Sequence, residues 1–438
     1  MARSSFAWTS LGASLGMLLT LSGCPLSDDY FIDSGRGGAS AGGVSSGGLG
    51  SGGANGGAAS TGGAPGSGGG PATGGQSGCV CAAGRSCVSG VCASGWVAMA
   101  APPSAFVPRS LPAAAAADGK WFIFGGRDKN GDVLNSAAIY DLATDSWRMV
   151  STDAATPSPR EMAAAVWVGT QVLVFGGRNA SGSDYYFSGA LYDPATDTWS
   201  SVNNAVIPRA AGVPAVAANH AIFWGGLTTG ANAASGAARY DLNNNTWQAA
   251  STQNAPSPML GVTWALGSDS LYLFGGIENN TRKDTVYRYD LVNDAWTALA
   301  RGPKARSAGF GAFDGTSFYV WGGRDGNTFL DDGGVYGTAW TSMSTANAPS
   351  TRSAPPRQQG WAFALGPGDV VFLGGQDDNG NFLTDGGRYG TSGWSQIPSW
   401  PSGEDHSFGA ATLLGGEVLV WGGADGNSPT STGERWAP

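Results

Sequence analysis

Histidine, cysteine and charged residues are scarce in this sequence. Only 2 of its 438 residues are His, 5 are Cys and 13% are charged, and no Cys follows Cys92. It contains no H-E-x-x-H motif and no cluster of metal-ligating residues, so we expect no metal and no other cofactor. The formal net charge of -9 leaves no basic excess to neutralise phosphates, which argues against nucleic acid as a partner.

A helical pattern is missing as well. After Gly95 no segment shows a sustained period of 3.6 residues, which argues against strands that alternate with helices. The chain is instead rich in Gly (73 residues) and Trp (17 residues), and 42% of it is hydrophobic. This composition is sufficient for a large buried core, and we predict an all-β fold.

The N-terminus has the pattern of an export signal. Arg3 is followed by a hydrophobic stretch over residues 11–21, which is too short to span a bilayer. The sequence LSGC at residues 21–24 resembles the lipobox of bacterial lipoproteins. The resemblance implies that residues 1–23 are a signal peptide and that Cys24 becomes the lipid-carrying N-terminus. The alternative is an ordinary secretory signal with a chance Cys near its end.

On the lipoprotein interpretation, the protein is exported and bound to a membrane of the cell envelope through Cys24. Because no Asp directly follows Cys24, we expect the outer membrane, on its periplasmic or surface face. Residues 24–78 then form a linker, which from residue 34 onward is almost entirely Gly, Ala, Ser and Thr. Such a segment buries too little apolar area to offset the entropy of ordering, so we expect a flexible tether.

Once the lipid-carrying Cys is set aside, four Cys remain, and all lie in one short segment, residues 79–92. An oxidising compartment favours disulfides in such a segment, so we predict two. Cys79 and Cys81 are too close to bridge each other comfortably, and each is expected to pair with Cys87 or Cys92. A zinc site is the weaker alternative, because the spacing C-x-C-x5-C-x4-C lacks paired C-x2-C knuckles.

From Gly95 to Pro438 the sequence repeats itself. An apolar run that ends in Gly-Gly recurs seven times, at Gly125-Gly126, Gly176-Gly177, Gly225-Gly226, Gly275-Gly276, Gly322-Gly323, Gly374-Gly375 and Gly422-Gly423. Each pair is followed by an aromatic residue, which is Tyr140, Tyr192, Tyr240, Tyr289, Tyr336, Tyr389 or Trp436. In the first six units a Trp comes next, at Trp147, Trp199, Trp247, Trp296, Trp340 and Trp394.

This pattern closely resembles the kelch repeat, in which a strand ending in Gly-Gly is followed by a Tyr and then a Trp. Seven in-phase copies over residues 95–438 make the resemblance specific, and it implies a seven-bladed β-propeller with four strands per blade. The residues fit this implication. Small side chains, as in residues 113–117, suit a crowded innermost strand, and an apolar run such as residues 121–124 suits a strand buried between blades.

The seventh unit is incomplete, because the chain ends shortly after Trp436 with no further Trp. The missing piece lies at the start of the repeat region. There the sequence Gly95-Trp96 matches Ser146-Trp147, which precedes the second inner strand. We therefore predict that Trp96 supplies the outer strand of the last blade. Pairing the two ends in this way removes the exposed edges of an open ring.

Cationic residues recur where the inner strands begin, and they are the strongest candidates for a binding site. They are Arg109, Arg160, Arg209, Arg306, Arg357 and His406, with Met259 in the fourth unit. The loops that follow Gly-Gly add Arg127, Arg178 and Arg324. In kelch proteins that this chain resembles, these loops open on the same face, so we expect both sets at one mouth of the channel.

Two interpretations of these residues stay open. In the first, they form a positive mouth that binds an anionic ligand, such as an acidic glycan or a carboxylate-bearing peptide. In the second, Arg at the start of an inner strand is a packing feature that pairs with Asp of the next blade or caps carbonyl groups.

We expect a binding module for a protein or glycan ligand rather than an enzyme. Galactose oxidase also has kelch repeats, but its copper site needs a Cys, and this repeat region has none. The alternative is a sugar-active enzyme that resembles the kelch-type N-acetylneuraminate epimerase. Its acid/base set would be His406, Glu404, Asp405 and the Arg residues.

Overall fold

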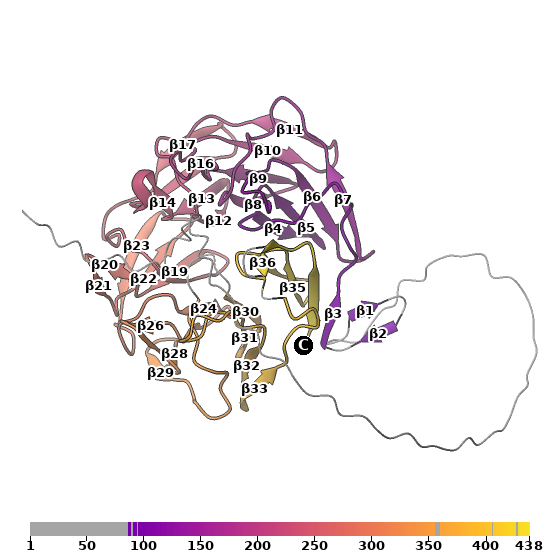
Figure 1. Ribbon diagram of the computed structural model, residues 1–438. Helices are drawn as coiled ribbons and strands as arrows, with labels where there is room; N and C mark the ends of the chain where they lie inside the picture. Colours follow the sequence, from indigo (N-terminus) through magenta and orange to yellow (C-terminus); the bar gives the residue numbers. More distant parts are fainter. Residues whose placement is uncertain (1–85, 89–90, 94, 355–359, 405, 426–427) are drawn as a thin grey trace, which may run out of the picture. The chain divides into compact units, whose positions relative to one another are not determined.

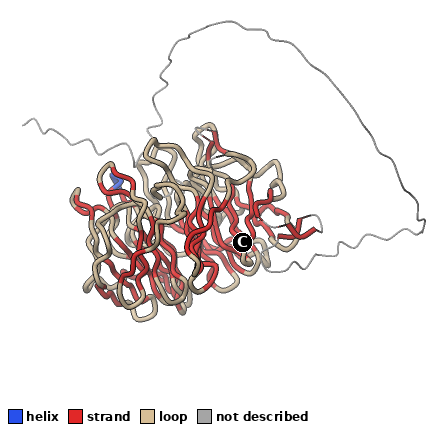
Figure 2. The backbone as a smooth tube through the Cα atoms, turned by 90° about the horizontal axis from the view of Figure 1, so that it is seen from below, coloured by secondary structure: helices blue, strands red, loops and turns tan. Residues whose placement is uncertain are grey.

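The computed structural model describes residues 86–88, 91–93, 95–354, 360–404, 406–425 and 428–438. Outside the described residues lie the predicted signal peptide, Cys24, the linker over residues 24–78, Cys79, Cys81 and Arg357. Within the described part, no helix is long and apolar enough to cross a membrane. One short 3-10 turn, Thr229–Ala231, is the helical structure described there, and the rest consists of strands and loops (Figure 2).

Seven four-stranded antiparallel sheets, the blades, surround a central channel (Figure 1). Blades one and two contain β4 (Ala113–Ala117), β5 (Lys120–Phe124), β6 (Ala137–Asp141), β7 (Ser146–Val150), and β8 (Ala164–Val168), β9 (Gln171–Phe175), β10 (Gly189–Asp193), β11 (Thr198–Ser201). Blades three and four contain β12 (Val213–Ala217), β13 (His220–Trp224), β16 (Ala237–Asp241), β17 (Thr246–Ala249), and β18 (Thr263–Leu266), β19 (Ser270–Phe274), β22 (Val286–Asp290), β23 (Ala295–Leu299). Blades five and six contain β24 (Phe310–Phe313), β25 (Phe318–Trp321), β28 (Gly333–Tyr336), β29 (Trp340–Ser342), and β30 (Trp361–Gly366), β31 (Asp369–Leu373), β32 (Gly386–Gly390), β33 (Gly393–Ile397). Blade seven contains β34 (Ala410–Leu414), β35 (Glu417–Trp421), β38 (Gly433–Ala437) and β3 (Gly95–Ala98).

Short hairpins add to this frame. Four lie in the loops after Gly-Gly, and they pair β14 (Leu227–Thr228) with β15 (Asn232–Ala233), β20 (Ile277–Glu278) with β21 (Thr281–Arg282), β26 (Arg324–Asp325) with β27 (Thr328–Phe329), and β36 (Ala424–Asp425) with β37 (Ser428–Pro429). A fifth pairs β1 (Ser86–Val88) with β2 (Val91–Ala93), and it places the backbones of Cys87 and Cys92 opposite each other.

The last blade is assembled from both ends of the repeat region. Strand β3 pairs with β38 in antiparallel register, with Trp96 opposite Trp436. The Trp96 indole lies 5.6 Å from the ring of Trp400 and donates through Nε1 to the Pro398 carbonyl oxygen at 2.8 Å. The predictions of seven blades, an all-β propeller and closure by the strand at Trp96 are therefore confirmed.

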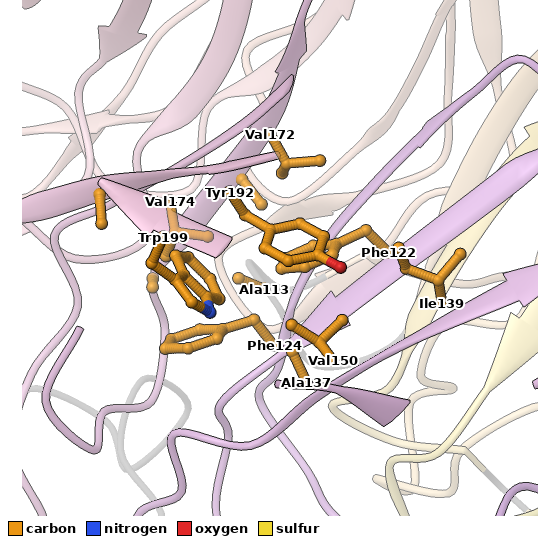
Figure 3. Packing of buried hydrophobic residues seen from close by; sticks show 13 residues of the cluster. Ala113, Phe122, Phe124, Ala137, Ile139, Val150, Val172, Val174, Tyr192 and Trp199 are labelled. Carbon is orange, nitrogen blue, oxygen red and sulfur yellow. The ribbon is translucent and has the colours of Figure 1, made fainter. Parts of the chain in front are cut away.

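The core is divided among the gaps between neighbouring blades. Along β5, Trp121 and Ile123 pack toward blade seven, while Phe122 and Phe124 pack toward blade two. Figure 3 shows the second set, where the Phe124 and Trp199 rings meet edge to face with centroids 5.6 Å apart. Because both faces of each second strand are covered, these strands are apolar over their last four residues rather than alternating.

The repeated Trp fastens each blade to the one before it. In every blade its indole Nε1 donates to a carbonyl just beyond the outer strand of the preceding blade, at 2.6–3.1 Å. The repeated Tyr often adds a second link. Tyr140 donates to Asp145, whose same oxygen accepts the backbone N–H of Ala100 from blade seven. The Tyr and Trp of the repeat thus specify contact between blades.

The Gly-Gly pairs allow the next blade to approach closely. Gly125 and Gly126 have φ of +66° and +95°, and a Cβ on Gly125 would lie 2.6 Å from the Arg160 carbonyl oxygen. That same oxygen accepts a hydrogen bond from the Gly126 N–H at 2.9 Å. A side chain on Gly125 would therefore push away the segment that begins the second blade.

Candidate functional site

One face of the propeller carries both sets of loops singled out from the sequence. In each blade a backbone bridge joins the residue before the inner strand to the residue after Gly-Gly. The pairs are Ser110 with Arg127, Glu161 with Arg178, Ala210 with Leu227, Leu260 with Ile277, Ser307 with Arg324, Ser353 with Gln376, and Ser407 with Ala424. We call this side of the molecule the Gly-Gly face. The bridges place the two sets of loops side by side.

The arginines that begin the inner strands point into the protein rather than toward solvent. Arg109 and Arg306 are both 0% exposed. In each case Nη1 donates to the carbonyl oxygen of the first Gly in the same blade's pair, from Arg109 to Gly125 (3.1 Å), Arg160 to Gly176 (3.0 Å), Arg209 to Gly225 (3.0 Å), Arg306 to Gly322 (2.9 Å) and Arg352 to Gly374 (2.9 Å). These contacts agree with the packing interpretation, in which the guanidinium caps carbonyl groups.

Burial affects the pKa of these arginines. It lowers the pKa of Arg109 to about 9 and the pKa values of Arg160 and Arg209 to about 10, so all three remain cations at neutral pH. Contacts inside the protein stabilise these cations. For example, the guanidinium carbon of Arg109 lies 3.7 Å from the centre of the Phe106 ring. Arg306 pairs with Asp332 of its own blade, not of the next one as expected. The positive charge is therefore held within the blades rather than presented at the mouth.

In the sixth blade this position is held by Arg352, and the predicted Arg357 lies outside the described residues. Arg352 lies 22 residues before the Gly whose carbonyl it binds, whereas the separation is 16 in the first blade. The longer segment before β30 misled a prediction based on nearly constant spacing.

In the seventh blade His406 takes the place of arginine. It is 0% exposed, and its Nδ1 lies 2.6 Å from the Gly422 carbonyl oxygen. Its Nε2 lies 2.7 Å from Oε2 of Glu434, which is buried as well. Both ring nitrogens are therefore committed to internal partners.

The arginines after Gly-Gly are closer to solvent, and two of them share a buried carboxylate. Glu161 accepts from Nε of Arg127 at 2.6 Å and from Nε of Arg178 at 2.7 Å. The Glu161 side chain is 0% exposed, while both arginines are partly exposed. Because Arg127 belongs to blade one and Arg178 to blade two, this cluster joins two blades at the Gly-Gly face. The third arginine, Arg324, has its guanidinium carbon 5.3 Å from the centre of the Phe329 ring.

A channel of about 620 Å³ runs between the inner strands of all seven blades. The side chains that line it are all hydrophobic, and backbone groups and the indole N–H groups of Trp264 and Trp361 are the polar groups among the described lining residues. Blades one to three contribute small residues such as Ala164 and Pro214, while blades four to six contribute Trp264, Phe310 and Trp361. Trp264 on β18 is 42% exposed, which is unusual for so large an apolar side chain.

Comparison with known proteins identifies the family of this chain. The sequence profile of the KLHDC2/KLHL20/DRC7 Kelch-repeats domain matches residues 86–211 and 210–423. The chain belongs to the kelch-repeat family. Among solved structures, one described as "Structure of YjhT" resembles this kelch propeller with a TM-score of 0.50, at 17% identity, over 68% of this chain and 99% of the other. That likeness shows the fold alone.

Curated kelch relatives match parts of the chain. Kelch repeat and BTB domain-containing protein 8 of Danio rerio is 26% identical over 42% of this chain and 31% of its own length. Beta-scruin of Limulus polyphemus is 23% identical over 49% of this chain and 24% of its own length. Kelch domain-containing protein 2 of Bos taurus is 30% identical over 32% of this chain and 36% of its own length. The match thus spans about a third or less of the first two relatives.

The acid/base set considered from the sequence is engaged within the kelch propeller. His406 binds Gly422 and Glu434, and the Glu404 carboxylate accepts the hydroxyls of Thr430 and Thr432. Asp405 lies outside the described residues. Within the described part of the chain, no three His, Cys, Asp or Glu side chains are grouped so as to hold a metal ion.

Three features of the site were not found from the sequence. Glu161 follows Arg160 directly where four other units have Ser, a difference that was visible in the repeat. Arg352 was hidden by the longer loop before β30. Trp264 carried no signal, because an isolated Trp in an apolar strand is as consistent with the core as with a channel.

Proposed function

We propose that this kelch propeller is an interaction module that binds a protein partner at the Gly-Gly face, with an uncharged apolar side chain of the partner inserted into the channel. The observation that supports this most strongly is the lining of the channel, in which every described side chain is apolar. Its volume of about 620 Å³ lies within the range of ligand-binding cavities.

The lining favours an apolar guest over a charged one. A carboxylate inside the channel would lose its hydration and find no cationic side chain among the described lining residues, which costs several kcal/mol. An aliphatic or aromatic side chain gains roughly 25 cal/mol for each Å² of apolar surface removed from water. Trp264 offers such a guest an exposed aromatic face.

Exposed groups in the loops of blades one and two fit a protein partner. On the Gly-Gly face, Arg127, Glu161 and Arg178 provide a charged cluster near the start of the inner strands. Phe187 and Val206 expose 46% and 83% of their surface, and the backbone joins their segments through the Ala205 N–H and the Phe187 carbonyl. Exposed apolar side chains of this kind are typical of surfaces that bind proteins.

The channel proposal predicts a strong effect of Trp264→Ala on binding. The full chain is screened in parallel against a peptide array and a glycan array. We expect it to bind peptides that present Leu, Phe or Trp, and we expect Trp264→Ala to weaken this binding about tenfold or more, since aromatic residues dominate such contacts. Val292→Ala is the matched control, because Val292 is 54% exposed but does not line the channel.

Two results would contradict the proposal. The first is binding of acidic glycans that Trp264→Ala leaves unchanged, with no peptide bound. The second is mutarotation of a sialic acid by the full chain above the spontaneous rate, which would favour the epimerase-like alternative.

We further propose that this module is exported and attached to the outer membrane through lipid on Cys24. The support is the LSGC sequence at residues 21–24 and the long Gly-rich linker that follows it. In a Gram-negative bacterium expressing the full chain, an alkyne-tagged fatty acid should label the wild type. Cys24→Ser should abolish both the label and the membrane fraction. Equal labelling of the two proteins would refute attachment at Cys24.

A further inference from the structure

Blade seven differs from the other blades at two positions that touch each other. His406 replaces the arginine found in five blades, and Glu434 lies in register with Val420 on the neighbouring strand. The residues at the equivalent register are Ala138, Ala190, Ala238, Tyr287, Gly334 and Gly387 in blades one to six. A carboxylate therefore occurs at this register only in the blade where histidine takes the place of arginine.

With Glu434 ionised, the geometry places a proton on each ring nitrogen of His406. The Gly422 carbonyl can only accept, so Nδ1 must donate to it. Nε2 faces a carboxylate oxygen of Glu434 at 2.7 Å, so it also donates when that carboxylate is ionised. The ring is then an imidazolium, which donates to a Gly carbonyl as the guanidinium does in five other blades. Unlike a guanidinium, an imidazolium can lose its proton in the physiological range.

The pair lies beside the closure of the ring. Glu434 stands on β38, between Val420 of β35 and Ala98 of the N-terminal strand β3. The Trp400 ring lies 5.6 Å from His406 on one side and 5.6 Å from Trp96 of β3 on another. A change in the His406–Glu434 contact therefore acts on the strand that receives β3 and on an aromatic neighbour of β3.

We propose that His406 and Glu434 form a proton-dependent latch on the closing blade. With its proton, His406 holds β35 and β38 together and so stabilises the pairing of β38 with β3. Without it, the lone pair of Nε2 faces the buried carboxylate, the hydrogen bond is lost, and the closing blade is weakened.

The direction of the pH dependence follows from the groups around the ring. Burial alone lowers the pKa of His406, but the hydrogen bond and charge of Glu434, with smaller effects from Gly422 and Glu404, raise it above its usual value. The latch is therefore complete below the unfolded pKa of about 6.5 and is lost as pH rises through the higher folded pKa. The charged groups in the described part of the chain that raise it are Glu434 and Glu404.

Histidine-selective 15N NMR on the full chain tests the protonation state directly, because the chain has only two His, His406 and His220. His220, half-exposed at the start of β13, is the internal control. We expect His406 to keep both ring nitrogens protonated above the ordinary histidine pKa of about 6.5. Glu434→Gln should bring the His406 transition to lower pH. A His406 ring that is already neutral near pH 6.5 would overturn the proposal.

A matched variant tests the consequence for stability. His406→Arg combined with Glu434→Ala gives blade seven the residues found at Arg109 and Ala138 in blade one. Between the unfolded pKa of about 6.5 and the higher folded pKa, the wild-type unfolding equilibrium constant should rise by up to about tenfold per pH unit relative to this variant, because unfolding releases one proton in that range. Parallel curves of melting temperature against pH for the two proteins would overturn the latch even if the NMR result held.

Discussion

Deletion of residues 95–100 from the full chain should lower the melting temperature of the propeller by roughly 10 °C or more. The deletion removes β3 and with it the Trp96 indole, which packs against Trp400 and Trp436. Trp96 is partly buried, so its removal takes apolar contact away from the core between blades six and seven. The deletion also removes Ala100, whose N–H binds Asp145 and whose carbonyl accepts the Trp147 indole. Blade seven would then expose an edge, and its contact with blade one would be lost.

The control is a deletion of equal length within residues 34–78, followed by the same calorimetric or fluorescence-detected melting. This control should melt like the wild type, because residues that are almost all Gly, Ala, Ser and Thr add little apolar surface to a core. Unchanged melting after deletion of 95–100 would show that β3 does not close the ring.

The double variant Arg127→Ala/Arg178→Ala should lose about 3–5 kcal/mol of unfolding free energy, because it leaves Glu161 buried without a cation. In the wild type the two guanidiniums bind opposite oxygens of this carboxylate, at 2.6 and 2.7 Å. Denaturant titration of the full chain measures the difference. The cost comes from the uncompensated charge more than from the two lost contacts.

A third substitution separates the effect of the uncompensated charge from that of the two lost contacts. Adding Glu161→Ser to the double variant removes the buried charge and introduces the residue found at Ser110, Ser307, Ser353 and Ser407. Most of the lost stability should return in the triple variant. If the triple variant is no more stable than the double variant, the arginines act through packing and not by compensating Glu161.

The fold was predictable from the sequence because the same packing pattern recurs in seven units. Each Gly-Gly marks a place where a Cβ would meet the backbone of an adjacent segment, as at Gly125 with Arg160. Each Trp marks a contact with the preceding blade, as Trp147 does with Ala100. The missing Trp of the seventh unit then had one available source, at Trp96. Packing rules that recur in register are visible in sequence.

The site was less predictable, since an Arg side chain can point into the protein or toward solvent and the sequence does not show which. Arg109 and Arg127 were both predicted to lie at the mouth, yet Arg109 caps carbonyls inside the blade and Arg127 lies partly exposed. The sequence also gave no measure of the channel, because its lining depends on which side chains of the inner strands turn toward the axis. From the sequence alone, Trp264 and Trp361 could not be distinguished from core residues.

Hydrogen exchange of the backbone amides in residues 95–98 tests the closed ring most directly. In the full chain, native and unmodified, a peptide covering β3 should exchange as slowly as one covering β38, because the two strands share a ladder from Gly95–Ala437 to Ala98–Glu434. Exchange of residues 95–98 at the rate of the Gly-rich segment 34–78 would contradict closure by the N-terminal strand, and the latch built on it.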